Sequence, residues 1–350
     1  MTTQIELRPG YRITRVIRGG WQLAGGHGAV DRAAAVADLA ATAEAGILTF
    51  DCADIYTGVE ELIGGFRTEY AGRHGQVALD AIKVHTKFVP DLEILPHISR
   101  AHVRQVIEQS LRRLRMERLD LVQYHWWDYS IPGCVETALW LEELRQEDKI
   151  NLIGGTNFDT DHTRRMVEAG VPIASMQVQY SLLDARPEHA LVEYCRQHDI
   201  HLLCYGSVAG GFLGDRWLGQ AEPFGQLENR SLTKYKLIVE DFGGWDLYQA
   251  LLRTLRQIAD RHGVDIATIA SRIMLDRPQV AAVIVGARNR THLAANARIT
   301  DLTLSAQDQA EIAAILAQRQ GPSGDAFTLE RDRNGRHGSI MKYNLNKQAS

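Results

Sequence analysis

The chain has 350 residues, of which 45% are apolar, and its 39 basic and 43 acidic residues give a formal net charge of −4. The basic residues are scattered and do not alternate with aromatic residues, which argues against nucleic acid or an anionic membrane as a partner. No run approaches the roughly 18 apolar residues of a membrane span, and the N-terminus lacks the pattern of a signal peptide. The four cysteines show no CxxC spacing, as expected of buried thiols in a reducing compartment. We therefore expect a cytoplasmic protein.

Strand and helix patterns alternate along most of the chain. A Pro9-Gly10 turn between two short alternating runs predicts a hairpin within residues 5–18, beneath the fold that follows. Strands are expected at residues 15–21, 47–50, 77–87, 119–124, 150–155, 174–179, 200–205 and 281–285. Helices are expected at residues 31–46, where Asp31 is the N-cap, and at 60–71, 99–115, 133–146, 160–169, 187–198, 246–275 and 290–298. Eight strand–helix units favour a closed (β/α)8 TIM barrel over an open sheet.

Two segments depart from this alternation. Residues 206–245, after the seventh strand, form a glycine-rich stretch of about forty residues, and loops of this length in a compact domain are usually functional or disordered. After a last helix at 305–318, residues 320–350 are polar with scattered aromatics and are expected to drape over the surface. We thus expect one domain over residues 1–350, with a barrel at about 15–319 and a C-terminal extension.

Four polar residues follow predicted strands. Asp51 ends the first of these strands and Tyr56 lies in the loop after it, while Lys87 and His125 end the next two strands. The carboxyl ends of parallel strands meet at one face of a barrel, which is where such folds place their chemistry. We therefore expect these side chains to lie together.

The segments FDCADIY, HTKF and LDLVQYHW, in this order, resemble the three signature regions of the aldo-keto reductases, which are NAD(P)H-dependent (β/α)8-barrel oxidoreductases. The resemblance covers residues 15 to 319. It implies that Asp51, Tyr56, Lys87 and His125 are the catalytic tetrad. It further implies reversible reduction of an aldehyde or ketone, with a hydride from C4 of the nicotinamide and a proton from Tyr56.

The chemistry of these residue types fits that role. A tyrosine with an ordinary pKa of about 10 becomes a useful acid near neutral pH when a lysine ammonium ~4 Å away stabilises its phenolate. Lys87 is the candidate for this ammonium, and Asp51 on the adjacent strand is placed to keep it charged. His125 is expected to donate a hydrogen bond from a neutral ring to the substrate oxygen.

No nucleotide-binding fingerprint is present, because GGWQLAGGHG contains neither GxGxxG nor a phosphate-binding loop. The resemblance instead implies a cofactor that lies extended over the barrel mouth, beneath the 206–245 loop. In the family the matching positions hold the carboxamide, stack on the nicotinamide, line the phosphates or contact the adenosine. Here these positions are Thr156, Asn157, Gln179, Tyr205, Ser207 to Leu213, Gly286, Arg288, His292 and Asn296.

This chain departs from the family pattern near the adenosine phosphate. Gly286 and Ala287 stand where a lysine or serine is common, and His292 replaces an arginine. Arg288 can still supply a bidentate phosphate contact, so NADPH is expected, with NADH possible. The resemblance also suggests that three tryptophans line the substrate pocket: Trp21, Trp126 and Trp127.

Two other functions compete with this one. A regulatory or structural member of the same fold would bind nucleotide with little turnover, and it can keep the tetrad. A metal-dependent hydrolase fits poorly, because the thirteen histidines form neither HxH nor HExxH, and no metal is expected. We therefore expect a small carbonyl compound as the binding partner, while the sequence leaves its identity and the oligomeric state open.

Overall fold

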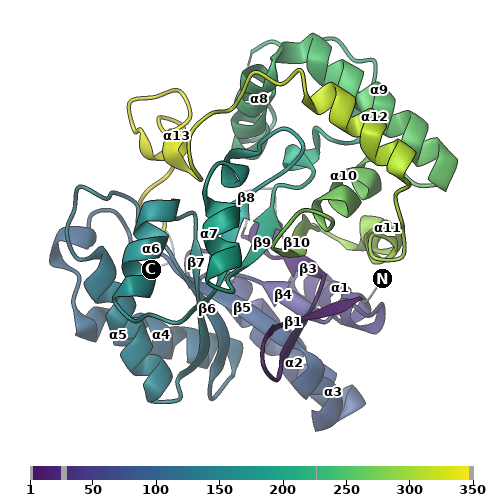
Figure 1. The fold of residues 1–350 in the computed structure, drawn as a ribbon. Coiled ribbons are helices and arrows are strands. Elements are labelled where there is room, and N and C mark those ends of the chain that lie inside the picture. The colour runs from purple at the N-terminus through teal and green to yellow at the C-terminus, as the bar shows by residue number, and fades with distance from the viewer. Residues whose placement is uncertain (1–2, 25–29, 226, 347–350) are drawn as a thin grey trace.

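A closed barrel of eight parallel strands lies at the centre of the protein (Figure 1). The structure is a computed structural model that describes residues 3–24, 30–225 and 227–346. The barrel strands are β3 (Val16–Gly19), β4 (Thr49–Asp51), β5 (Lys83–Phe88), β6 (Leu119–Tyr124), β7 (Ile150–Thr156), β8 (Ile173–Gln179), β9 (His201–Tyr205) and β10 (Val280–Gly286). The sheet closes where β10 pairs with β3. The predicted (β/α)8 barrel is therefore confirmed.

Helices surround the barrel, either on its outer face or packed on other helices (Figure 1). They are α1 (Arg32–Glu44), α2 (Val59–His74), α3 (Gln76–Ala81), α4 (Arg100–Leu114), α5 (Cys134–Gln146), α6 (Thr160–Glu168), α7 (Leu191–Gln197), α9 (Gly244–His262), α10 (Ile266–Met274), α11 (Leu293–Arg298) and α12 (Ala306–Leu316). Asp31 caps α1 as predicted, because its side chain accepts a hydrogen bond from the Ala34 amide. Phe50 of β4 contacts Phe66 of α2 with ring centroids 5.1 Å apart, so the main apolar core lies between strands and helices.

The N-terminal hairpin covers the end of the barrel where the strands begin. Its strands are β1 (Gln4–Arg8) and β2 (Tyr11–Thr14). Gly10 adopts φ +79° in the turn, a left-handed conformation that glycine takes without steric cost. Leu7 is buried in one apolar cluster with Ile17 of β3, and the ammonium of Lys83, at the start of β5, lies 5.8 Å from the Tyr11 ring centroid. The opposite, carboxyl end of the barrel is left for polar side chains.

Three predicted elements were wrong in extent or type. Residues 76–81 form α3 and the strand starts only at Lys83; Val77 is 87% exposed, whereas a barrel strand is buried on both faces. The helix predicted at 246–275 is two helices, because Gly263 takes φ +61° between α9 and α10. The 206–245 stretch contains a further helix, α8 (Arg230–Phe242), which buries Tyr235 and its other apolar residues at helical spacing. Residues 25–29, which include the end of the glycine-rich sequence GGWQLAGGHG, lie outside the described residues.

The C-terminal extension has a structure of its own, which we call the tail (residues 320–346). It leaves α12, forms the single-turn helix α13 (Thr328–Arg331) and continues toward α6, as the yellow trace in Figure 1 shows. Its polar composition predicted a surface-draped segment, yet Phe327, Glu330 and His337 are buried. Over the described ranges, no helix is both long and apolar enough to cross a membrane.

Candidate active site

Asp51 and Lys87 form an ion pair at the carboxyl ends of the adjacent strands β4 and β5. The Lys87 Nζ lies 2.6 Å from Asp51 Oδ2, and each side chain is only 5% exposed. The ammonium also donates to the carbonyl oxygen of Cys52 at 2.8 Å. Burial acts against a charged lysine, but Asp51 outweighs it and raises the pKa of Lys87 above its ordinary value. The pair predicted from the sequence is therefore present, and Lys87 keeps its charge.

The second oxygen of Asp51 is held by two buried amides that the sequence analysis missed. Gln123 of β6 donates from Nε2 to Asp51 Oδ1 at 2.9 Å, and Gln177 of β8 donates to the same oxygen at 2.7 Å. Both glutamines are buried inside the barrel. Their positions in the sequence could have indicated this role, because each is a polar residue at an inward-facing strand position and a buried polar group needs a hydrogen-bond partner.

Tyr56 lies beside this pair. The Lys87 Nζ is 4.9 Å from the centroid of the Tyr56 ring, and the Trp21 ring packs edge-on against the same ring at 5.1 Å. Burial raises the pKa of Tyr56, and Lys87 works in the opposite direction without bringing it below its ordinary value. The expected effect of Lys87 is therefore present, but the prediction of a lowered pKa is wrong in this structure because desolvation of the phenolate is the larger effect.

His125 is fixed by the backbone of the neighbouring strand. Its Nδ1 lies 2.9 Å from the carbonyl oxygen of Thr156, and because a carbonyl oxygen only accepts, Nδ1 carries the proton. Burial, together with the charge of Arg331, lowers the pKa of His125 to about 3, so the ring is neutral at physiological pH. Its Nε2 is buried without a hydrogen-bond partner in the described part of the chain. In this tautomer Nε2 is an acceptor, which differs from the donor expected from the sequence.

The ends of β7, β8 and β9 bring together the four residues expected around the nicotinamide. Tyr205 donates from its hydroxyl to Asn157 Oδ1 at 2.8 Å, and Asn157 takes φ +63°. Gln179 donates from Nε2 to Asp184 Oδ2 at 2.7 Å, while its Oε1 is buried with no partner among the described residues. A buried acceptor of this kind is suited to an amide donor of a ligand, so the residues present fit a carboxamide.

The residues expected around the phosphates fall into two groups. Ser207 and Leu213 lie in the loop after β9 and are buried, with Ser207 Oγ 3.1 Å from Ser271 Oγ. The second group is exposed: Gly286 ends β10, and Arg288 and His292 follow it. Arg288 is therefore accessible to an anion, whereas the side chains of Ser207 and Leu213 are buried in the core.

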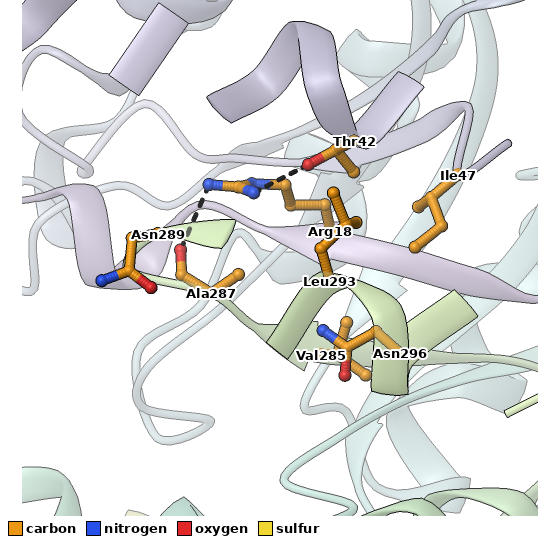
Figure 2. Close-up of a pocket in the computed structure, with 8 residues that line it drawn as sticks. All are labelled: Arg18, Thr42, Ile47, Val285, Ala287, Asn289, Leu293 and Asn296. Carbon is orange, nitrogen blue, oxygen red and sulfur yellow. Dashed lines mark hydrogen bonds between the residues drawn. The ribbon is translucent and has the colours of Figure 1, made fainter. Parts of the chain in front are cut away.

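Asn296 of α11 lines a small cavity beside this exposed group, away from the tetrad. Figure 2 shows that Arg18, which the sequence analysis missed, reaches into it between Thr42 and Ala287. Its guanidinium donates to Thr42 Oγ1 at 2.8 Å and to the Ala287 carbonyl oxygen at 3.4 Å. Burial lowers the pKa of Arg18. A strand residue of β3 thus places a buried cation under the predicted adenosine end of the site.

The model of the aldo/keto reductase family matches residues 15–317 of the chain. The chain belongs to the aldo/keto reductase family. It is 30% identical over 324 residues to the aldo-keto reductase YhdN of Bacillus subtilis, with 91% of this chain and 95% of that protein covered. It is 25% identical over 317 residues to the NADH-specific methylglyoxal reductase of Escherichia coli, covering 85% of this chain and 92% of the relative. The fold is similar to that of the glycerol dehydrogenase of Gluconobacter oxydans (TM-score 0.76, 24% identity, 91% and 97% of the two chains).

Two of the three predicted tryptophans border the tetrad of this aldo-keto reductase. Trp21 is 41% exposed beside Tyr56, and the Trp127 ring lies edge-on to His125 at 4.3 Å. Trp126 does not join them: it is fully buried, and its Nε1 donates to the carbonyl oxygens of Asp128 and Ile131. Trp126 instead packs edge-on against the Tyr124 ring of β6 at 6.2 Å, whereas Trp127 packs against His125.

The tail of this aldo-keto reductase covers His125. The Phe327 ring lies edge-on to the His125 ring at 5.7 Å. Arg331 donates to the carbonyl oxygens of Trp127, at 2.8 Å, and of Asn157, at 2.7 Å. The sequence near residue 330 does not predict these contacts, because they join segments more than 170 residues apart. The tail is therefore part of the wall of the site.

Proposed function

We propose that this NAD(P)H-dependent oxidoreductase reduces an aldehyde or ketone to the alcohol, with Tyr56 as the proton donor. The observation that carries the proposal is the buried Asp51–Lys87 ion pair beside the partly buried Tyr56, with 2.6 Å between the charged atoms and 4.9 Å from Nζ to the centroid of the tyrosine ring. NAD(P)H, when bound, would supply the hydride. Thr156, Asn157, Gln179 and Tyr205 are the residues proposed to hold its nicotinamide end.

Proton transfer from Tyr56 depends on Lys87. Burial raises the pKa of Tyr56, so the hydroxyl carries its proton at neutral pH but is a weaker acid than a free tyrosine. Once the proton has left, the Lys87 ammonium stabilises the phenolate, and Asp51 holds that ammonium in place. His125, with Nε2 as an acceptor, would receive a hydrogen bond from a hydroxyl such as that of the alcohol product.

Cofactor oxidation tests this function directly. Addition of nitrobenzaldehyde to the protein with NADPH, and separately with NADH, is expected to lower the absorbance of the reduced nicotinamide. Consumption of cofactor in proportion to alcohol formed supports the reductase. If the protein binds NADPH but oxidises none with a panel of aldehydes and ketones, it is instead a nucleotide-binding regulatory or structural member of the family.

Activity is expected to be independent of His125 protonation between pH 5 and 8. The folded pKa of about 3 lies well below the ordinary value near 6.5, so the ring stays neutral over this range. The stability of the fold does depend on His125. Between about pH 6.5 and pH 3 the unfolded chain binds a proton at His125 and the folded chain does not. The contribution of His125 to the free energy of unfolding therefore falls as pH falls. A shift of the His125 ring resonances near pH 6.5 in the folded protein would contradict this.

We propose NADPH as the preferred cofactor, with Arg288 as its determinant, although a relative is named NADH-specific. Arg288 is exposed after β10, where a guanidinium can bind a phosphate with two hydrogen bonds. Arg288→Ala is expected to raise KM for NADPH by about 10- to 100-fold, the loss of one or two charged hydrogen bonds, and to leave KM for NADH unchanged. Arg290→Ala is the matched control, because Arg290 is paired with Asp38 at 3.0 Å. An equal loss with both cofactors would reject the assignment.

A further inference from the structure

A fully buried ionic cluster joins the tail to the barrel mouth. Arg186, which follows β8, lies between two carboxylates: its Nε and Nη2 donate to Asp184 at 2.9 and 2.7 Å, and its Nη1 and Nη2 donate to Glu330 of α13 at 2.8 and 3.0 Å. The three side chains are at most 1% exposed. Glu330 lies beyond residue 317, where the match to the family model ends.

The cluster determines the orientation of the Gln179 amide. Asp184 Oδ2 accepts from Arg186 Nη2 and from Gln179 Nε2, both at 2.7 Å. A rotated amide would set its oxygen against the carboxylate, so Nε2 must face Asp184 and Oε1 must face away. Oε1 is the buried acceptor that has no partner within the described ranges. The carboxylate thus prepares one free oxygen for an incoming donor.

Charge balance explains why the tail carries a carboxylate here. The Lys234 Nζ of α8 lies 3.7 Å from Glu330 Oε1 and 5.4 Å from the centroid of the Tyr205 ring. Two cations and two carboxylates then sum to zero at their formal charges. Burial would raise the pKa of Glu330, but Arg186 and Lys234 outweigh it and lower this pKa to about 2. Without Glu330 the cluster would keep one uncompensated positive charge beside the nicotinamide residues.

We propose that Glu330 is a positioning residue for the nicotinamide, acting through Arg186 and Asp184 to hold Gln179 Oε1 ready for the carboxamide. The inference rests on the proposed contact between Gln179 and the carboxamide. The negative charge of Glu330 also favours the oxidised cofactor, whose nicotinamide ring is positive. The tail therefore contributes to cofactor binding through a chain of hydrogen bonds, without touching the cofactor itself.

Binding measurements on Glu330→Gln test the proposal. The Kd of NADPH is expected to rise about 3- to 10-fold, the value of one hydrogen bond, and that of NADP+ to rise more. The Kd of adenosine 2′,5′-bisphosphate, which has no nicotinamide, is expected to stay unchanged. In a Gln179→Ala background, Glu330→Gln is expected to weaken NADPH no further, because the path through Gln179 is gone. Asp91→Asn is the control for a loosened tail, since Asp91 holds only its far end, at the amides of Leu345 and Asn346.

The outcomes separate this inference from the proposed function. If Gln179→Ala weakens NADPH but Glu330→Gln does not, or if the effect of Glu330→Gln persists without Gln179 or extends to the bisphosphate, the positioning role is overturned. If Gln179→Ala leaves NADPH affinity unchanged, the proposed carboxamide contact fails as well. If Glu330→Gln does not fold, hydrogen exchange on the wild type tests the proposal. Coupling between two sites is reciprocal, so NADPH binding must slow exchange of the amides of residues 328–332. Binding of the bisphosphate must leave their exchange unchanged.

Discussion

Tyr56→Phe is expected to lower kcat for carbonyl reduction by about 10²- to 10⁴-fold, the usual value of general acid catalysis, with little change in the Kd of NADPH. The substitution removes only the hydroxyl, and the ring can keep its packing against Trp21, whose centroid lies 5.1 Å away. The effect should therefore fall on the chemical step and leave KM largely unchanged. Steady-state kinetics with nitrobenzaldehyde, together with fluorescence titration of NADPH, measure the two quantities.

Tyr194→Phe is the matched control. The Tyr194 hydroxyl lies on α7 and has no hydrogen-bond partner among the described residues, so its removal is expected to leave both kcat and Kd unchanged. A Tyr56→Phe protein that keeps wild-type kcat would show that another group supplies the proton.

The barrel could be predicted because its strands are buried on both faces and therefore read as short apolar runs between helical patterns. The same signal wrongly predicted a strand at Val77, which belongs to an apolar run but lies on an exposed helix. In α8 the helical signal was present, since Leu232, Tyr235 and Ile238 are buried at three-residue spacing. The glycines on both sides of α8 nevertheless favour the interpretation of this stretch as a loop.

The positions of Asp51, Tyr56, Lys87 and His125 at the barrel mouth could be predicted for a geometric reason: each residue ends or follows a strand, and parallel strands bring their carboxyl ends together. No such rule applies to the tail. Phe327, Glu330 and Arg331 reach the site through long-range packing that leaves no periodic pattern in the sequence. The net pKa of Tyr56 was also beyond prediction, because it depends on how far the ring is desolvated, whereas the sequence indicates only which charges lie nearby.

Lys87→Met is expected to abolish most activity and to lower the free energy of unfolding at neutral pH by about 3–5 kcal/mol, because it leaves a buried carboxylate without its cation. Asp51 would then keep only the amides of Gln123 and Gln177. Urea unfolding of the variant and of the wild type at neutral pH measures this loss of stability.

The double variant Lys87→Met, Asp51→Asn separates the two roles of the ion pair. With both charges removed, no carboxylate remains to be desolvated, so the double variant is expected to be more stable at neutral pH than Lys87→Met alone. Its kcat is expected to stay as low as that of the single variant, because the ammonium 4.9 Å from the Tyr56 ring is still missing. If stability and kcat recover together, Lys87 serves only the fold. Recovery of stability alone would assign Asp51 to holding the lysine and Lys87 to stabilising the phenolate of Tyr56.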